Sequence, residues 1–289
     1  MTRVVALGGG HGLAASLAAV RRYADDVSAV VSVADDGGSS GRLRDAFGIP
    51  PPGDLRKCLV ALARPDSLWT AAFEHRFGAG DLEGHAFGNL VIAGLADATG
   101  DFEVALAEAG RLLGAVGRVL PATSEPVVLK AATGDGLGSV SGQVAVGQAG
   151  RIAGVSLVPA DPAPPPAVLE VLAGADQVVI GPGSLFTSVL AVVAVPAIRD
   201  ALATTAARKV YVCNLREQPP ETSGYDVAAH VDALRAHGLE VDVVLHHPGG
   251  LRVGRPSVPC VERPVAREGA AVHDPELLAV ALEELAAGG

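Results

Sequence analysis

Hydrophobic residues along the chain fall into short runs that alternate with longer segments in which apolar residues recur every three or four positions. Residues 3–7 form a β-branched run closed by glycines, residues 13–23 show helical spacing, and residues 27–33 form a second run. This order predicts a strand, a helix and a strand. Because the helix is long enough to serve as a crossover, we predict a right-handed unit and a parallel sheet.

The next part of the chain, residues 54–114, is predicted as a helical segment. The predicted helices lie at 54–63, 67–77 and 86–98. Residues 118–158 then show short alternating runs, which predict an antiparallel β-hairpin insertion. Its predicted elements are strands at 127–131 and 140–146 and a turn at Gly134-Asp135-Gly136.

Alternation of strands and helices resumes after the proline-rich residues 161–166. The predicted elements are a helix at 167–173, strands at 177–180, 209–213 and 241–245, and helices at 225–237 and 275–287. We therefore predict one α/β domain over residues 1–289. Its expected core is a doubly wound, Rossmann-related, mostly parallel sheet with helices on both faces and a small antiparallel β-hairpin section.

Composition narrows the class of protein. Hydrophobic residues make up 49% of the chain but aromatic ones only 3%, so Ala, Val and Leu must fill the interior. The formal charge of -10 argues against nucleic acid as a partner. Cys58, Cys213 and Cys260 are far apart and indicate neither a disulfide framework nor a zinc site.

The uncharged stretch 177–198 is interrupted by Gly181-Pro182-Gly183-Ser184, so we expect a buried strand, a loop and a helix rather than a membrane span. The apolar run before Gly8 is too short for a secretory signal. A cytoplasmic protein is therefore expected.

The first candidate site follows the first strand and opens the first helix. It contains Gly9, Gly10, His11 and Gly12. Free backbone N–H groups and the helix dipole favour an anion there. The segment lacks both the third glycine of a dinucleotide fingerprint and the Gly-Lys-Ser/Thr of a P-loop. A tight turn without a ligand is the alternative, and His11 could donate either to a phosphate or to a loop carbonyl.

The second candidate follows the second strand. Asp35 and Asp36 could hydrogen-bond a ribose or hold Mg²⁺ bound to phosphates. Ser39, Ser40 and Arg42 come next and offer hydroxyl groups and fixed positive charge to an anionic oxygen. A solvated turn would explain the Asp and Gly residues but not the Ser-Ser-Gly-Arg sequence.

Further candidate ligand-binding residues occur at later helix starts and strand ends. They are Asp54 and Arg56, His85 and Asn89, Gly181, Gly183 and Ser184, and Asn214 and Arg216. A solvated helix end explains the first pair equally well, and satisfied buried polar groups explain the second pair. Because loops after parallel strands converge at one edge of an open sheet, we expect these loops to meet.

Several segments together resemble the gluconeogenesis factor family, the YvcK-like proteins within the superfamily of the 2-phospho-L-lactate transferase CofD. They are GGGHGL, VADDGGSSGRLR, PPGDLRKCLVALA, GHAFGNL, IGPGSLFTSVL and YVCNLREQPPETSGYD. The resemblance covers residues 4 to about 246. It implies a CofD-like fold and a cytoplasmic regulator of cell shape and of growth on gluconeogenic carbon sources, which binds UDP-N-acetylglucosamine.

The resemblance also implies an alternative, a Mg²⁺-dependent transferase that takes a phospholactyl group from a nucleotide diphosphate, with Asp35 and Asp36 at the metal. No reaction is assigned, so the regulator is the leading hypothesis. A homo-oligomer and a protein partner in cell-wall regulation are expected. An NAD-linked dehydrogenase fits the opening pattern but not the glycine spacing.

The chain departs from the family at two places. His11 stands where relatives usually have Thr, and both side chains can donate to a phosphate. Val272 stands where relatives often carry a basic residue. If that cation meets a diphosphate, affinity is weaker here, or Arg252, Arg255 or Arg267 supplies the charge.

Overall fold

The computed structural model describes residues 1–134 and 138–287, so Asp135 and Gly136 of the predicted turn lie outside the described residues. Within these ranges seven strands pair in parallel in one large sheet. In chain order they are β1 (Arg3–Gly8), β2 (Asp26–Val31), β3 (Arg118–Pro121), β7 (Gln177–Ile180), β8 (Arg208–Val212), β9 (Val243–His246) and β10 (Cys260–Glu262). Their spatial order is β10-β9-β8-β7-β1-β2-β3.

The chain reverses direction across the sheet beside β1. It first moves outward through β2 and β3, then returns to β7 on the other side of β1 and continues through β8, β9 and β10. Val4 aligns with Val27 of β2 and with Gln177 of β7. This doubly wound order confirms the predicted fold class. It also creates a topological switch point between β1 and β7, where ligands of open α/β sheets bind.

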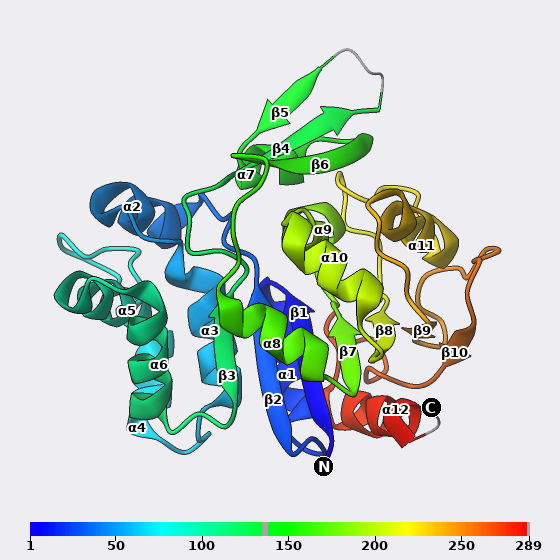
Figure 1. Cartoon of the computed structure of the whole chain (residues 1–289), viewed down its shortest axis with the longest axis horizontal. Helices are drawn as coiled ribbons and strands as arrows, with labels where there is room; N and C mark the ends of the chain where they lie inside the picture. The colour runs from blue at the N-terminus through cyan, green and yellow to red at the C-terminus, as the bar shows by residue number, and fades with distance from the viewer. Residues whose placement is uncertain (135–137, 288–289) are drawn as a thin grey trace.

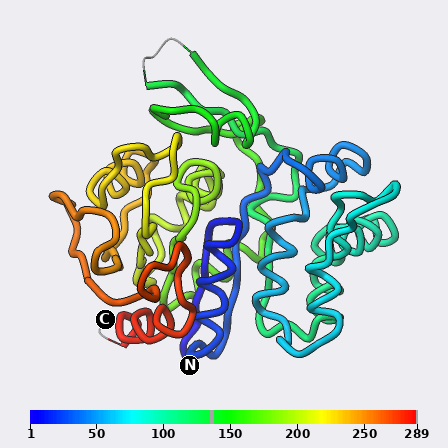
Figure 2. The backbone as a smooth tube through the Cα atoms, turned by 180° about the vertical axis from the view of Figure 1, so that it is seen from behind, coloured from blue at the N-terminus to red at the C-terminus, as the bar shows by residue number. Residues whose placement is uncertain are grey.

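Helices lie on both faces of the large sheet, as predicted, and further helices pack on other helices. They are α1 (Gly10–Val20), α2 (Gly38–Phe47), α3 (Pro52–Leu62), α4 (Leu68–Glu74), α5 (Phe87–Thr99), α6 (Phe102–Leu113), α8 (Pro166–Gly174), the π-helix η1 (Leu185–Val189), α9 (Leu190–Val193), α10 (Pro196–Thr204), α11 (Val227–Ala236) and α12 (Pro275–Ala287). Helices α1 and α12 pack on one face, and α8, α9 and α10 lie on the other (Figures 1 and 2). Ala6 and Leu7 of β1 are therefore fully buried. Helices α2, α4 and α5 are among those that pack on other helices.

Two helices include residues that the sequence pattern placed in loops. Helix α1 begins at Gly10 rather than at residue 13, so most of the first glycine-rich candidate is the first turn of a helix. Helix α2 contains Ser39, Ser40 and Arg42, which were expected in a loop. Glycine and serine are weak helix formers, and few apolar residues of α2 face the core, so the sequence carries little helical signal there.

A small antiparallel sheet stands at the end of the molecule where the parallel strands end (Figure 1). It consists, within the described residues, of β4 (Val128–Thr133), β5 (Ser139–Ser141) and β6 (Ile152–Val158), with helix α7 (Gln143–Gln148) between β5 and β6. Two predicted bounds were wrong. Residues 118–121 form β3 of the large sheet rather than part of the hairpin section. Residues 143–146, predicted as part of a strand, lie in helix α7. The Asp36 carboxylate stabilises the start of this helix by accepting from the Val144 N–H at 3.0 Å.

Strand β10 was not predicted, because its three residues lie among prolines and polar residues and give no alternating run. Across residues 1–134 and 138–287, no one helix combines the length and apolar composition needed to cross a bilayer. The segments Leu185–Val193 and Pro196–Thr204 meet the criterion only jointly and are bent by 78°.

Candidate functional site

Loops that follow β1, β2, β7 and β8 meet at the carboxyl edge of the large sheet and enclose two adjoining cavities. The α3-side cavity, of about 310 Å³, is lined by residues including Gly10, Asp35, Asp54, Lys57 and Ser184. The second cavity, of about 290 Å³, is lined by residues including Asn214, Arg216, Val272 and His273. We call it the strap-side cavity because Val272 and His273 belong to a segment near the end of the chain, residues 263–274, which we call the C-terminal strap. Both cavities are lined by His11, Gly12, Gly183 and Gln218. The predicted convergence of the loops at the switch point is therefore observed.

The loops are in direct contact at Gly12. A Cβ atom on Gly12 would lie 2.1 Å from the carbonyl oxygen of Pro182, so only glycine fits. The Asn214 side chain then links the third loop. Its Oδ1 accepts from the Gly183 N–H at 3.0 Å, and its Nδ2 donates to the Gly183 carbonyl at 2.8 Å. The loops after β7 and β8 are thus hydrogen-bonded to each other, and Gly12 packs closely against the loop after β7.

Carboxylates of the chain already occupy the helix starts at the switch point. Asp54 Oδ2 accepts from the Gly10 N–H at 2.8 Å, and its Oδ1 accepts from Lys57 Nζ at 2.9 Å. The free N–H groups expected at the first candidate are therefore not found at Gly10, whose amide donates to Asp54. The Gly183 amide likewise donates to Asn214. Asp54, which lies in the first turn of α3, thus caps the start of α1.

Glu221 caps the start of η1 in the same way as Asp54 caps α1. It was not identified from the sequence. Its Oε1 accepts from the N–H groups of Phe186 at 2.7 Å and Thr187 at 3.0 Å. Burial raises the pKa of Glu221, and these hydrogen bonds oppose that rise. Nothing local in the sequence signals this contact, because Glu221 lies in a loop 35 residues after Phe186.

The two adjacent aspartates after β2 point to different places. Asp35 lines the α3-side cavity, accepts from the Gly37 N–H at 2.9 Å and has a pKa raised by burial. Asp36 instead caps α7. Neighbouring residues of an extended segment face opposite sides, which separates the two carboxylates. Asp54, rather than Asp36, is the carboxylate that lines this cavity with Asp35, and a metal site made by Asp35 and Asp36 stays a prediction.

A second group of predicted residues forms a polar network beside the cavities. Asn89 Nδ2 donates to Ser39 Oγ at 3.2 Å, and Ser39 Oγ lies 3.1 Å from His85 Nδ1. Arg56 Nε donates to Asn89 Oδ1 at 3.1 Å. Burial lowers the pKa of the Arg56 guanidinium. This network joins the starts of α2, α3 and α5, and its residues line neither cavity.

Three further predicted residues, Ser40, Arg42 and Gly181, also lie outside both cavities. A Cβ atom on Gly53 would lie 2.2 Å from Ser40 Oγ, so Ser40 packs tightly against the start of α3. Arg42 Nη2 donates to the Glu83 carbonyl at 3.0 Å. Gly181 precedes the cavity-lining Pro182, and its carbonyl accepts from Ser16 Oγ at 2.6 Å. These residues position the loops, and their direct contact with a ligand stays a prediction.

One wall of the strap-side cavity is formed by Ala271, Val272 and His273 of the C-terminal strap. Arg216 Nη2 donates to the carbonyls of Gly269 and Ala270 at 3.2 and 3.0 Å. His273 Nε2 hydrogen-bonds the Cys213 carbonyl at 3.2 Å, and burial lowers the pKa of His273 to about 4. Val272 lines the cavity without supplying charge. Arg216, a cation of the loop after β8, thus lines the same cavity as Val272.

The three arginines considered as substitutes for a cation at 272 are placed elsewhere. Arg267 pairs with Asp274 and Glu276. Arg252 and Arg255 are exposed and absent from the described lining of the strap-side cavity. Arg216, which does line it, is the cation best placed for an anion there.

His11 lies where the two cavities join. Burial, then the charge of Lys57, lowers the pKa of its imidazole, which favours the neutral form of His11. A neutral imidazole carries one N–H donor and one acceptor nitrogen. His11 can therefore give a hydrogen bond to a ligand oxygen without adding charge.

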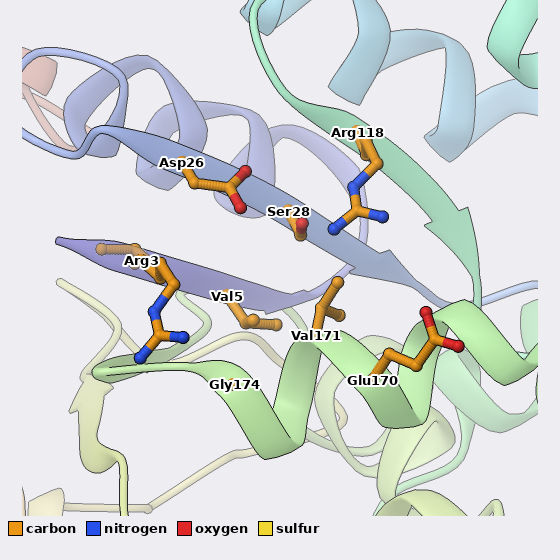
Figure 3. A pocket seen from close by; sticks show the side chains of 9 residues that line it. Arg3, Val5, Asp26, Ser28, Arg118, Glu170, Val171 and Gly174 are labelled. Carbon is orange, nitrogen blue, oxygen red and sulfur yellow. The ribbon is translucent and has the colours of Figure 1, made fainter. Parts of the chain in front are cut away.

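Another cavity, of about 190 Å³, lies at the opposite edge of the sheet (Figure 3). Arg3, Asp26 and Arg118 stand at the starts of β1, β2 and β3, facing helix α8 with Glu170. Arg3 is paired with Asp176 at 2.9 Å. Because ligands of open α/β sheets bind at the carboxyl ends of the strands, this cavity is not the candidate site.

Substitution of Gly12 by alanine tests the contact that joins the loops. The new Cβ would meet backbone atoms of Pro182, which no side-chain rotation relieves. We expect Gly12→Ala to lower the free energy of unfolding by about 1–3 kcal/mol, measured by urea denaturation. Gly94→Ala in α5, where a Cβ meets nothing within 4 Å, should be neutral or stabilising by up to about 1 kcal/mol. Equal effects of the two changes on the free energy of unfolding would contradict the close contact between Gly12 and Pro182.

The buried His273 should make stability depend on pH. The unfolded state binds a proton near pH 6.5, but folded His273 does so only near pH 4. The free energy of unfolding should therefore fall by up to about 3 kcal/mol from this group as the pH decreases between these values. His273→Gln should flatten that part of the urea-denaturation profile. The exposed His75→Gln change should leave the profile as it is.

Comparisons with known proteins agree with this architecture. The family model described as 2-phospho-L-lactate transferase CofD matches residues 4–252. A gluconeogenesis factor from Halalkalibacterium halodurans is 44% identical over 248 residues, which are 84% of this chain and 77% of that protein. The gluconeogenesis factor of Bacillus subtilis is 45% identical over 237 residues, covering 81% of this chain and 74% of that protein.

Coverage differs among relatives. A relative from Nostoc, 46% identical over 250 residues, is matched over 85% of this chain but only 55% of its own length. A crystal structure of a UPF0052 family protein from Bacillus halodurans superposes with a TM-score of 0.91 at 37% identity, covering 98% of both chains. The fold, the switch-point loops and these matches together show that the chain belongs to the CofD family and is a relative of the bacterial gluconeogenesis factors.

Proposed function

We propose that this chain is a cytoplasmic regulator that binds UDP-N-acetylglucosamine and is required for cell morphogenesis and for growth on gluconeogenic carbon sources. The observation that carries the proposal is the junction of two cavities at the switch point, with His11, Gly12, Gly183 and Gln218 lining both. Each cavity alone is at the lower end of the range for small-molecule sites. A ligand with two ends and a charged middle would use both.

One cation on each side of the junction supports a diphosphate at its centre. Lys57 lines the α3-side cavity together with Asp35 and Asp54, and Arg216 lines the strap-side cavity together with Glu217. His11, in its neutral form, adds a donor between the two cations. Asp54 is already hydrogen-bonded to Gly10 and paired with Lys57, which limits its repulsion of an anion.

Regulation would follow from the elements that a ligand joins. Gln143 of α7 lines the α3-side cavity, so a ligand there would contact the small antiparallel sheet as well as the switch-point loops. A ligand that binds one arrangement of these parts more tightly shifts the population toward it. We propose that a protein partner in cell-wall regulation, or another copy of the chain, reads this shift.

Titration calorimetry with UDP-N-acetylglucosamine tests the proposal. The wild-type chain should show saturable binding, and Arg216→Ala should weaken it about tenfold, equivalent to about 1.4 kcal/mol, because a cation near the phosphates is lost. Arg255→Ala removes an exposed arginine outside the cavities and should leave affinity unchanged. A flat titration of the wild-type chain at millimolar ligand would remove the proposal.

A second candidate function, a Mg²⁺-dependent phospholactyl transferase, is favoured by one observation. Asp35 and Asp54 both line the α3-side cavity, and Mg²⁺ bound to substrate phosphates commonly takes one or two carboxylates and several waters. Among the described residues no group of three or more His, Cys, Asp or Glu could hold a metal ion alone. The residues therefore fit Mg²⁺ only together with a phosphate ligand. When bound, the ion would neutralise phosphate charge.

The transferase is tested by incubating the chain with Mg²⁺, a phospholactyl nucleotide and a deazaflavin alcohol, with product detected by mass spectrometry. If it is an enzyme, Asp35→Asn should lower the rate at least about 100-fold through loss of a metal ligand. Asp36→Asn, whose carboxylate faces α7, should retain activity. Absence of product at high concentrations of wild-type chain would count against this function.

A further inference from the structure

A groove distant from the switch point lies between the end of α2 and the turn that joins α5 to α6. It encloses about 560 Å³. Its apolar lining includes Phe47, Ile49 and Phe102, and the Phe47 ring is 50% exposed although it ends a helix that otherwise packs on α5. A half-exposed phenylalanine in a concave surface is available to contact another apolar side chain. We call this surface the α2–α6 groove.

Carboxylates surround this apolar floor. Asp97, Asp101 and Glu103 line the groove, and no Lys, Arg or His is among its described lining residues. Asp101 Oδ1 caps α6 by accepting from the N–H groups of Glu103 and Val104 at 2.8 and 3.1 Å. Glu103 Oε1 accepts from Ser124 Oγ at 3.3 Å. These neutral partners leave the negative charges uncompensated.

Asp97 is placed against local electrostatics. It lies in the last turn of α5, where the helix dipole is negative and where the helix carries no basic residue. Helix capping explains Asp101 and favours Glu103, but it does not explain Asp97. A carboxylate at this position would be stabilised by a cation brought by another molecule.

We propose that the α2–α6 groove binds an extended basic segment of another protein, in which lysine or arginine side chains flank an aromatic or aliphatic one. The apolar side chain would rest on Phe47, and the flanking cations would pair with Asp97 and Glu103. The same carboxylates repel phosphate groups, so neither nucleic acid nor an anionic membrane fits this surface. Charge complementarity is what selects a basic protein segment.

The groove and the switch-point site are linked by α2. Ser39 near the start of this helix belongs to the polar network beside the cavities, and Phe47 ends it at the groove. The proposal names a docking surface for the partner in the proposed regulatory function. It does not require that UDP-N-acetylglucosamine is the ligand, because the groove binds through its own residues.

Fluorescence anisotropy tests the groove with a labelled peptide of sequence Gly-Lys-Lys-Phe-Lys-Lys-Gly. Saturable binding that weakens with added salt is expected for the wild-type chain. The double variant Asp97→Asn/Glu103→Gln and the single variant Phe47→Ser should each bind at least tenfold more weakly. A matched double variant, Asp66→Asn/Glu283→Gln, makes the same charge change at exposed residues elsewhere and should stay within twofold of wild type.

Two results would overturn the proposal: no saturable binding to the wild-type chain, or equal weakening in the groove and control double variants. A peptide with serine in place of phenylalanine should bind at least fivefold more weakly, and equal binding would likewise refute the role of Phe47. Circular dichroism establishes that each variant is folded. Calorimetry with UDP-N-acetylglucosamine on the same variants separates a failure of the groove from a failure of the switch-point site.

Discussion

The close approach of the loops after β1 and β7 is the constraint on which the rest of the site depends. Gly12 lies against the Pro182 carbonyl so tightly that no side chain fits between them. Asn214 extends this contact to the loop after β8 through two hydrogen bonds to Gly183. Because three strands of the sheet end in this one unit, the cavities on either side of it have fixed walls. A ligand that spans the junction contacts a preformed surface and loses little free energy in ordering it.

Carboxylates of the chain accept hydrogen bonds from the N–H groups at two helix starts, where an anionic ligand would otherwise bind. Asp54 accepts from Gly10 at the start of α1, and Glu221 accepts from Phe186 and Thr187 at the start of η1. Buried N–H groups without an acceptor would be costly, and these carboxylates remove that cost. In the proposed function, recognition of a phosphate would therefore fall to side chains such as Lys57, Arg216 and His11 rather than to free helix amides.

The polar network beside the cavities has a different physical role. Arg56, Asn89 and Ser39 link three helix starts through hydrogen bonds between buried side chains. Removing one member would leave a buried donor or acceptor unpaired, which is why such networks specify a single arrangement of their helices. Residues that sequence reasoning assigned to a ligand thus include some that hold α2, α3 and α5 in place around the site.

The sequence by itself determined the order of most strands and helices, the doubly wound sheet and the set of loops that meet at its carboxyl edge, but not β10 or α7. Buried strands and amphipathic helices leave a local hydrophobic pattern, so residues 177–180 and 275–287 were predicted to the residue. Only the tertiary structure decided which helix start each carboxylate caps: Asp36 caps α7, Asp54 caps α1 and Glu221 caps η1. These hydrogen bonds join residues that are 108, 44 and 35 positions apart, and their partners are chosen by how the elements pack, which no local pattern encodes.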